Sequence, residues 1–426
     1  MFVSINIIKL KINLTDSYFL SILGLCLFIE DGYLHKKTGL CKHYYENRNS
    51  ESNVAGSHHN ARRQLQPGGE PELTENIHIY DGADFEEVTK TTLFVDKSLL
   101  IKRIFDNTKH GSGILIQTPS KFGKSTNLNM VKRFFEINLD DKGNIITSED
   151  TKNYKIFRNN YLNIYKMRQF FDRHFGKYPV VFIDYKPLSK VVTVEQMLAV
   201  FFREVMSETF SPHKYLLNDP YLWQHNRTLS WIDRDKFERF VNPELNKKLT
   251  ETDIRTGFSF LCKLLHKRYE TPVVVLVDNF DSFVDSPLYA QNSDIFHLMS
   301  AVNCDLLRCD SVGRSVVTGL IRGSGPTVAV GELLPANIGE ARQVWPYFGL
   351  SGSELGELLV PIISDPEARE KAIGRIVHSY SGYSVATFEV GEDGSGQLLD
   401  SQTCSVWSVI KYMEKELAVE NFSSMV

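Results

Sequence analysis

The sequence predicts an α/β fold of three layers, in which helices cover both faces of a parallel sheet. Two observations predict it. Short, continuous apolar runs recur after about residue 76, and amphipathic stretches long enough for crossover helices lie between them. A continuous apolar run is typical of a strand that is buried on both faces of its sheet. We therefore expect a main domain over residues 76–349 and a smaller region over residues 350–426.

The composition agrees with a folded chain. Of the 426 residues, 42% are hydrophobic and 23% are charged, which excludes a mostly disordered, collagenous or coiled-coil protein. The net charge of -4 indicates neither nucleic acid nor an anionic membrane surface as a partner. The six cysteines are scattered and form no CxxC pair, so we interpret them as isolated thiols rather than as a zinc site or a disulfide scaffold.

The N-terminal segment differs from the rest of the chain. Lys9 and Lys11 precede an apolar run at residues 18–29, which is too short for a membrane-spanning helix of about 20 residues. A positive flank before a short apolar core is typical of a secretory signal peptide, so residues 1–30 predict a secreted protein, although no small-residue cleavage site follows. A cytoplasmic protein with a buried leader is the alternative. Residues 31–75 are poor in aliphatic side chains and predict a flexible linker.

Four apolar runs predict the strands of the main domain. They are residues 113–117, 180–185, 273–277 and 314–318. Helical patterns lie between them at residues 126–137, 193–209 and 252–269. Their lengths suit right-handed crossovers between parallel strands.

A loop with a Gly-Lys-Ser sequence follows the first predicted strand, at residues 118–126, and a helical pattern follows the loop. This order is typical of a phosphate-binding P-loop, although Thr118 replaces the first glycine of the full pattern. Gly123 lets backbone N–H groups approach phosphates, Lys124 can reach the β- and γ-phosphates, and Ser125 can bind Mg²⁺. We expect a nucleotide to be bound by Phe122, Gly123, Lys124, Ser125 and Thr126, and the domain to be P-loop NTPase-like.

A carboxylate follows the third predicted strand. Asp278 lies where the strand reaches its carboxyl end, beside the expected phosphate loop, and we predict that it holds Mg²⁺ together with Ser125. A helix-capping role is the alternative for Asp278, but that role does not explain the apolar run before it. The next strand ends near Thr318, and Arg322 follows as a candidate sensor of the γ-phosphate. Asp278, Asn279 and Arg322 are therefore the predicted catalytic positions.

Residues 85–415 resemble the AAA-ATPase-like family of predicted P-loop ATPases, whose members often carry a PD-(D/E)XK nuclease-like domain. Residues 94–101 are similar to the family's Tyr-Val-Asp-Lys-Thr opening, and residues 119–125 to its Pro-Arg-Arg-Phe-Gly-Lys-Ser loop, which also lacks the first glycine. Residues 278–281 resemble its Asp-Glu-Tyr-Asp segment. Further landmarks follow in the same order at residues 318–322, 348–350, 380–383 and 407–409. The resemblance implies ATP and Mg²⁺ as ligands.

Three departures from the family pattern change what the resemblance implies. Asn279 replaces a glutamate, and an amide can orient a water molecule but cannot accept its proton at neutral pH, so we expect weak or absent hydrolysis. Asp281 is a second, less favoured candidate for the carboxylate that would accept the proton of the water molecule in place of the missing glutamate. Ser120 and Lys121 replace two arginines, which predicts weaker attraction of phosphate. Too few residues follow the last landmark for a nuclease domain, so nuclease activity is not implied.

Asp184-Tyr185-Lys186 contains an acidic-x-Lys pair of the kind that nucleases carry on a strand. We interpret this half-motif as part of an ordinary core strand, because the pair stands alone.

The C-terminal residues 350–426 predict a small helical lid. Ser351 with Glu354 and Ser364 with Glu367 form two candidate capping boxes. By analogy of fold alone, such a lid reports the state of the nucleotide to a protein partner, which the sequence does not identify. The predicted function is an ATP- and Mg²⁺-binding protein with weak hydrolysis; the alternative is a secreted, catalytically dead interaction protein that retains the scaffold. The sequence leaves the oligomeric state open.

Overall fold

The computed structural model describes residues 80–140, 143–224, 228–248, 250–289, 293–321, 333–340, 342–360, 363, 365–390 and 396–423, which belong to one compact unit. The expected signal peptide (residues 1–30), the expected linker (residues 31–75) and Arg322 lie outside the described residues. In the part that is described, no helix is long and apolar enough to cross a membrane.

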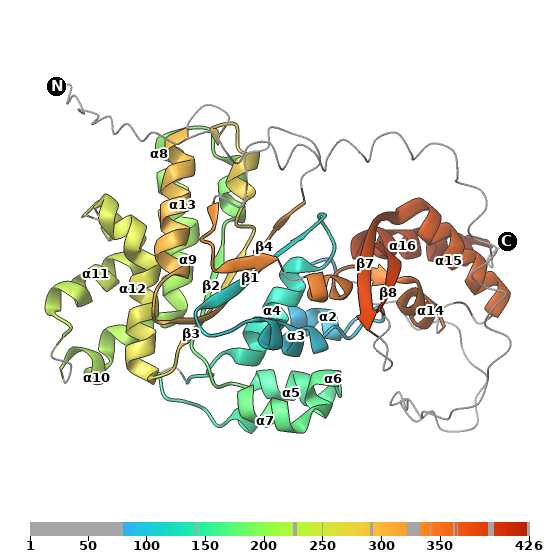
Figure 1. Cartoon of the computed structure of the whole chain (residues 1–426), viewed down its shortest axis with the longest axis horizontal. Helices are drawn as coiled ribbons and strands as arrows, with labels where there is room; N and C mark the ends of the chain where they lie inside the picture. Colours follow the sequence, from blue (N-terminus) through green and yellow to red (C-terminus); the bar gives the residue numbers. More distant parts are fainter. Residues whose placement is uncertain are drawn as a thin grey trace. The chain divides into compact units, whose positions relative to one another are not determined.

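Strands and helices alternate through the main domain, as the sequence predicts (Figure 1). The strands are β1 (Ser112–Thr118), β2 (Val180–Asp184), β3 (Val273–Asp278), β4 (Val312–Leu320), β5 (Ile338–Glu340), β6 (Leu350–Ser351), β7 (Ser381–Val390) and β8 (Gly396–Cys404). The helices of the main domain are α2 (Phe85–Thr89), α3 (Leu99–Asn107), α4 (Lys124–Phe135), α5 (Lys152–Asn159), α6 (Asn163–Lys166), α7 (Arg168–His174), α8 (Val194–Val200), α9 (Ser207–Phe210), α10 (Pro220–Trp223), α11 (Trp231–Val241), α12 (Glu251–Tyr269) and α13 (Ser293–Leu307). The C-terminal helices are α14 (Gly352–Leu359), α15 (Pro366–Tyr380) and α16 (Val406–Ser423).

A parallel sheet with the strand order β2-β3-β4-β1-β5 forms the centre of the main domain. All four predicted strands are confirmed as β1 to β4, and the short edge strand β5 was not predicted. In this order β1 lies beside β4 and β4 lies beside β3. The carboxyl ends of these parallel strands therefore meet at one edge of the sheet, where ligands of open α/β sheets bind.

The sheet separates two hydrophobic clusters because successive residues of a strand point to opposite faces. In β3, Val273, Val275 and Val277 pack into one cluster, whereas Val274 and Leu276 pack into the other. The first cluster includes residues of α8, α9, α11, α12 and α13, and the second includes residues of α3, α4, α5 and α7 (Figure 1). The predicted three-layer α/β class is confirmed.

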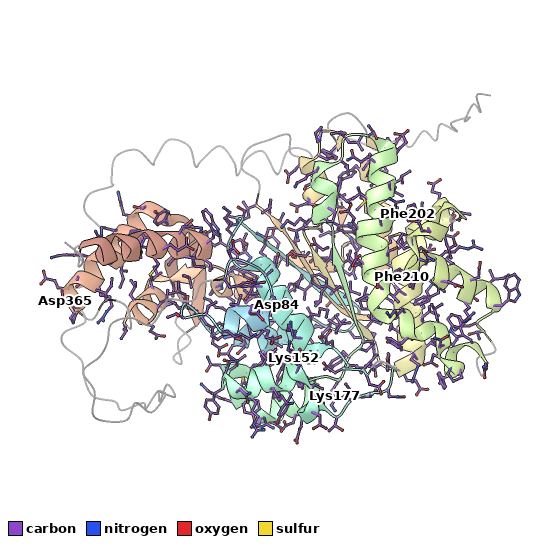
Figure 2. All side chains as sticks on the ribbon, turned by 180° about the vertical axis from the view of Figure 1, so that it is seen from behind. Asp84, Lys152, Lys177, Phe202, Phe210 and Asp365 are labelled. Carbon is purple, nitrogen blue, oxygen red and sulfur yellow. The ribbon has the colours of Figure 1, made fainter. Side chains whose placement is uncertain are left out.

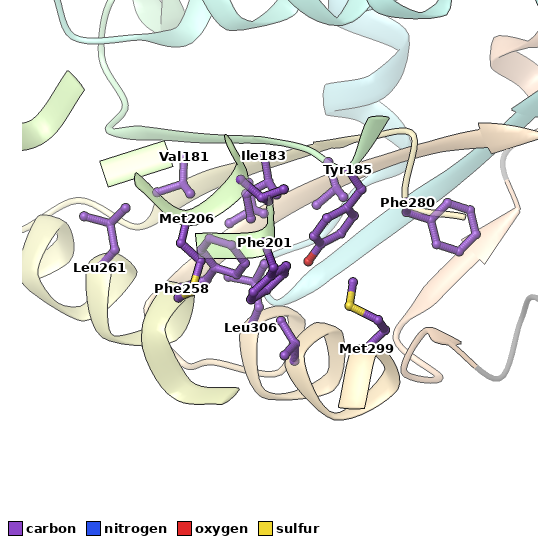
Figure 3. Packing of buried hydrophobic residues seen from close by; sticks show 14 of the residues in the cluster. Val181, Ile183, Tyr185, Phe201, Met206, Phe258, Leu261, Phe280, Met299 and Leu306 are labelled. Carbon is purple, nitrogen blue, oxygen red and sulfur yellow. The ribbon is translucent and has the colours of Figure 1, made fainter. Parts of the chain in front are cut away.

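The first cluster packs around the residue that follows β2. Figure 3 shows the ring of Tyr185 among Phe201, Met299 and other buried side chains. Tyr185 is fully buried, and its hydroxyl donates a hydrogen bond of 3.0 Å to the side-chain oxygen of Asn303. Burial raises the pKa of this phenol well above its ordinary value. Phe202 and Phe210, labelled in Figure 2, belong to the helical stretch that covers this cluster, where a π-helical turn at Phe201–Met206 joins α8 to α9.

The N-terminal part of the domain is fixed to α4 by ion pairs. Asp84 caps α2 and accepts from the Arg133 guanidinium of α4 at 2.9 Å, and Lys152 of α5 pairs with Glu86 at 2.7 Å. Asp84 and Lys152 are labelled in Figure 2. The Arg133 pair places α2 against the helix that follows the Gly-Lys-Ser loop, and the Lys152 pair joins α2 to α5.

The C-terminal region contains the expected helices α14, α15 and α16, but it also contains an antiparallel sheet of β6, β8 and β7, so the prediction of an all-helical lid was incomplete. The β-branched and aromatic residues at 383–390 favour a strand, but the helix signals on both sides of this segment led to the prediction of helices alone. The Ser351–Glu354 capping box is present at the start of α14. Ser364 lies outside the described residues, and Asp365 accepts a hydrogen bond from the Ala368 N–H at the start of α15.

Candidate functional site

The loop at residues 119–123 joins the carboxyl end of β1 to the amino end of α4. Lys121 and Gly123 adopt positive φ angles of 67° and 85°, on either side of Phe122. Such an alternation turns successive backbone N–H groups inward and forms an anion-binding concavity. Helix α4 has no side-chain cap at its start and no acidic residue in its first turn, so its free N–H groups and its dipole favour an anion at this point.

Gly349 and two residues of the C-terminal region support the loop from outside. The backbone N–H of Gly349 donates to the carbonyl of Phe122 at 3.0 Å, and the Ser405 hydroxyl donates to the carbonyl of Lys121 at 3.3 Å. The Lys121 ammonium lies 3.3 Å from the centroid of the Trp407 ring, which is a cation–π contact. The curvature of the loop therefore depends on residues 349 and 405–407 as well as on its own sequence.

Lys124 is the first residue of α4, and its side chain is 7% exposed. Its ammonium group donates to the carbonyls of Thr118 and Pro119 at 2.9 and 2.7 Å, across the loop. Burial lowers the pKa of Lys124 to about 8, and the nearby Asp278 and Asp281 carboxylates oppose this shift. The lysine thus crosses the concavity and lies close to two acidic groups.

Three elements meet at the carboxyl group of Asp278, the last residue of β3. The hydroxyl of Ser125 from α4 hydrogen-bonds to it, the hydroxyl of Thr318 from β4 donates to its Oδ1, and the N–H of Asn279 donates to the same oxygen at 3.0 Å. Burial raises the pKa of Asp278, and the hydroxyl donors oppose this shift. The structure therefore brings together Lys124, Ser125 and Asp278, which the sequence predicted as neighbours.

The chain turns sharply after Asp278, because Asn279 adopts a positive φ of 54°. This turn directs the Asn279 amide toward β2, where its Nδ2 donates to Oδ1 of Asp184 at 2.9 Å. From the sequence we interpreted Asp184 as an ordinary strand residue, and we did not predict this contact. One signal could have indicated it: Asp184 and Asp278 each end a predicted strand, and the structure places them opposite each other in neighbouring parallel strands.

The sequence also drew attention to Asp281, Thr318 and Arg322, near the end of β4. Asp281 is 1% exposed, and its Oδ2 accepts a hydrogen bond from the Leu320 N–H at 3.1 Å. Its carboxylate is therefore directed toward the end of β4, whereas Asn279 faces β2. Thr318 lies beside Asp278, as described above, and Arg322 belongs to the residues that the structure does not describe.

A cavity of about 200 Å³ opens beside the loop, and Phe122, Gly123 and Thr126 form part of its wall. Charged and polar side chains, among them Asp81, Lys97 and Asn127, also line it. Apolar residues from both ends of the described chain form much of the rest of the wall: Val88, Leu93, Val95, Val406, Trp407 and Ile410. Sequence reasoning missed this cavity. The resemblance had singled out residues 94–101 and 407–409, but it gave no reason why they should lie together.

The donor set around Asp278 fits a small hard cation. Mg²⁺ prefers oxygen ligands and is usually held by one or two carboxylates together with substrate phosphates. Asp278 and Ser125 provide a carboxylate and a hydroxyl that already contact each other beside the loop. No cluster of three or more His, Cys, Asp or Glu side chains suited to a metal occurs within the described residues, so a tightly coordinated transition-metal site finds no support among them.

Comparison with known proteins gave one match. Residues 80–322, more than half of the chain, match the model of a family described as predicted AAA-ATPase, AAA-ATPase_like. The matched segment contains β1 to β4, the 119–123 loop, Asp278 and Asp184. Searches of curated proteins and of solved structures found no significant match.

Proposed function

Because the chain belongs to the AAA-ATPase-like family of predicted AAA-ATPases, we propose that it binds ATP with Mg²⁺ at the 119–123 loop. One observation carries the proposal: an uncapped helix start, a buried lysine and a hydroxyl–carboxylate pair converge on one concave loop at the carboxyl edge of a parallel sheet. A triphosphate supplies the negative charge that the helix start and Lys124 favour.

Each residue has a separate task in the proposed complex. The N–H groups around Gly123 bind phosphate oxygens, and the Lys124 ammonium exchanges its carbonyl partners for the β- and γ-phosphates. Ser125 and Asp278 would hold Mg²⁺, which neutralises charge on the phosphates when bound. Thr318 fixes the orientation of the Asp278 carboxyl through its hydrogen bond. The largely apolar cavity beside Phe122 and Trp407 offers the adenine ring a surface on which to pack.

We propose that hydrolysis is slow in comparison with an enzyme that carries a glutamate at position 279. General-base catalysis contributes about 10²- to 10⁴-fold, and the Asn279 amide is already engaged with Asp184. A bound ATP molecule should therefore remain unhydrolysed for longer than in such an enzyme.

Titration of the purified protein with a fluorescent ATP analogue, with and without Mg²⁺, tests the proposed binding. We expect saturable binding that Mg²⁺ strengthens. Lys124→Ala should weaken it by about 10- to 100-fold, because hydrogen bonds to charged groups contribute about 1.5–3 kcal/mol. Lys155→Ala, which removes an exposed lysine on α5, serves as the control and should bind normally. Equal affinity of wild type and Lys124→Ala, or binding by neither, contradicts the proposal.

A further inference from the structure

The Asp184–Asn279 pair lies beside the proposed metal-holding carboxylate, on the side away from β4. β2 and β3 are parallel neighbours, and Asp184 is opposite Asp278 in their register. Burial is the main cause of the raised pKa of Asp278, and the negative charge of Asp184 adds to it, as expected for two carboxyl groups at the ends of neighbouring strands. The Asn279 side chain bridges toward Asp184 at 2.9 Å.

Packing fixes the direction of the Asp184 side chain. Tyr185, the next residue, is buried in the cluster that includes Phe258 of α12 and Met299 of α13 (Figure 3), so its neighbour must emerge on the other side of the chain. The backbone N–H of Lys186 donates to Oδ1 of Asp184 at 2.8 Å. Both hydrogen bonds that Asp184 accepts from described residues fall on Oδ1, which leaves Oδ2 for a water molecule.

Among the described residues, the other polar groups at this edge are unsuited to accept a proton from water. Asn279 is an amide. Asp278 already accepts from Ser125, Thr318 and the Asn279 N–H, and the proposed metal would occupy it. Asp281 is buried and directed toward the Leu320 N–H at β4. Asp184 is half-buried, and it is the carboxylate adjacent to the position where the base of a hydrolase would stand.

We propose that Asp184 is the catalytic base of the slow hydrolysis, with Asn279 as the residue that positions the attacking water. This inference rests on the proposed function of the site. In this arrangement β3 supplies the amide, Asn279, and β2 supplies the carboxylate, Asp184. The site thereby retains a proton acceptor that a comparison of position 279 alone would miss.

The proposed step balances as follows. The oxygen of the water forms a bond to the γ-phosphorus while the bond from that phosphorus to the bridging oxygen breaks. ADP leaves with the electron pair of the broken bond, and the water's proton passes to Oδ2 of Asp184. The proton then leaves to solvent, and the products are ADP and inorganic phosphate. No other reactant is required.

Asp184→Asn tests this role with little change in structure, because an asparagine oxygen can still accept the hydrogen bonds from Asn279 and Lys186. Phosphate release should fall by about 10²-fold or more at saturating ATP, whereas the affinity for a fluorescent ATP analogue should remain within about threefold of wild type. The exchange variant Asp184→Asn/Asn279→Asp restores a carboxylate to the pair and should recover at least a tenth of the wild-type rate.

The possible results separate the two proposals. If the wild type binds ATP and Asp184→Asn releases phosphate at the wild-type rate, the base assignment is overturned while the binding proposal stands. The same holds if the wild type binds ATP but releases no phosphate, or if Asp281→Asn abolishes release and Asp184→Asn does not. Absence of binding in the wild type overturns both. A loss of rate with unchanged affinity, and its recovery in the exchange variant, supports Asp184.

Discussion

At the scale of single residues, the loop depends on backbone angles that most side chains disfavour. Gly123 has a φ of 85°, and a Cβ added there would have only Val406 Cγ2, at 3.9 Å, within 4 Å. Space is therefore available for a methyl group, and the conformation itself restricts the position to glycine. Gly111, at the other end of β1, has a similar φ of 74° and no atom near its added Cβ.

Gly123→Ala and Gly111→Ala form a matched pair for this reason. Each should lower the free energy of unfolding by about 1 kcal/mol, because both place an alanine in the left-handed region. Only Gly123→Ala should weaken binding of the ATP analogue, since relief of its strain rotates the N–H groups of the loop. Urea unfolding and nucleotide titration of both variants measure the two effects. Equal binding by the two variants would show that the loop does not contact the ligand.

The sequence predicted the Lys124–Ser125–Asp278 neighbourhood from local rules alone. A helix start after β1 and a carboxylate at the end of β3 must share one edge of a parallel sheet. The Asp184–Asn279 contact could not be predicted in this way. It requires both the register of β2 against β3 and the left-handed turn at Asn279, and neither is encoded in a short motif.

At the scale of elements, one ion pair joins the segment before α3 to the start of α14. Lys97 Nζ lies 2.5 Å from Oε1 of Glu354, and its side chain is only 11% exposed. Burial lowers the pKa of Lys97, and the Glu354 carboxylate opposes this shift. The other oxygen of Glu354 accepts from the Ser351 N–H at 2.9 Å in the capping box. One side chain therefore both starts α14 and ties it to the main domain.

Glu354→Gln should destabilise the protein by about 1.5–3 kcal/mol, because it removes the nearest counter-charge of the largely buried Lys97. The midpoint of urea unfolding should fall with an unchanged slope. Glu357→Gln, at an exposed position on the same helix, is the control and should shift the midpoint little. Coincident unfolding curves for the two variants would contradict this role of the ion pair.

Elements with a strong period were predictable, and those defined by distant partners were not. The continuous run in β3 has all six residues buried, and the amphipathic α12 begins with the Thr250–Asp253 capping box. β5 has three residues and exists because it pairs with β1. β6 has only two residues, which pair with the end of β8. Such short strands carry no periodicity of their own.

At the scale of the whole molecule, burial of a titratable group couples folding to pH. His213, which follows α9, is half-buried, and desolvation lowers its pKa to about 4; the positive charge of Lys132 acts in the same direction, and a hydrogen bond with the Val180 backbone opposes it. In the unfolded chain a histidine has a pKa of about 6.5. The unfolded state therefore binds a proton at His213 between pH 6.5 and 4, where the folded state does not.

The stabilising contribution of neutral His213 should be fully present above pH 6.5 and decrease as the pH falls toward 4, by on the order of 2 kcal/mol in total. Urea unfolding of wild type and His213→Gln across this range measures the difference. The variant should lose less stability on acidification, whereas His110→Gln, which replaces an exposed histidine, should follow the wild type. Parallel pH profiles for wild type and His213→Gln would exclude this contribution.

The contacts of Lys121 with Ser405 and Trp407 also have a consequence for biosynthesis. Lys121 and Ser405 are 284 positions apart in the sequence. At about 5–20 residues per second, a ribosome adds Ser405 roughly 15–60 s after it has added Lys121. By then all five strands of the parallel sheet have been synthesised. A nascent chain thus completes the synthesis of its sheet well before the tryptophan that braces the loop, so the braced loop is among the last parts of the proposed site to form.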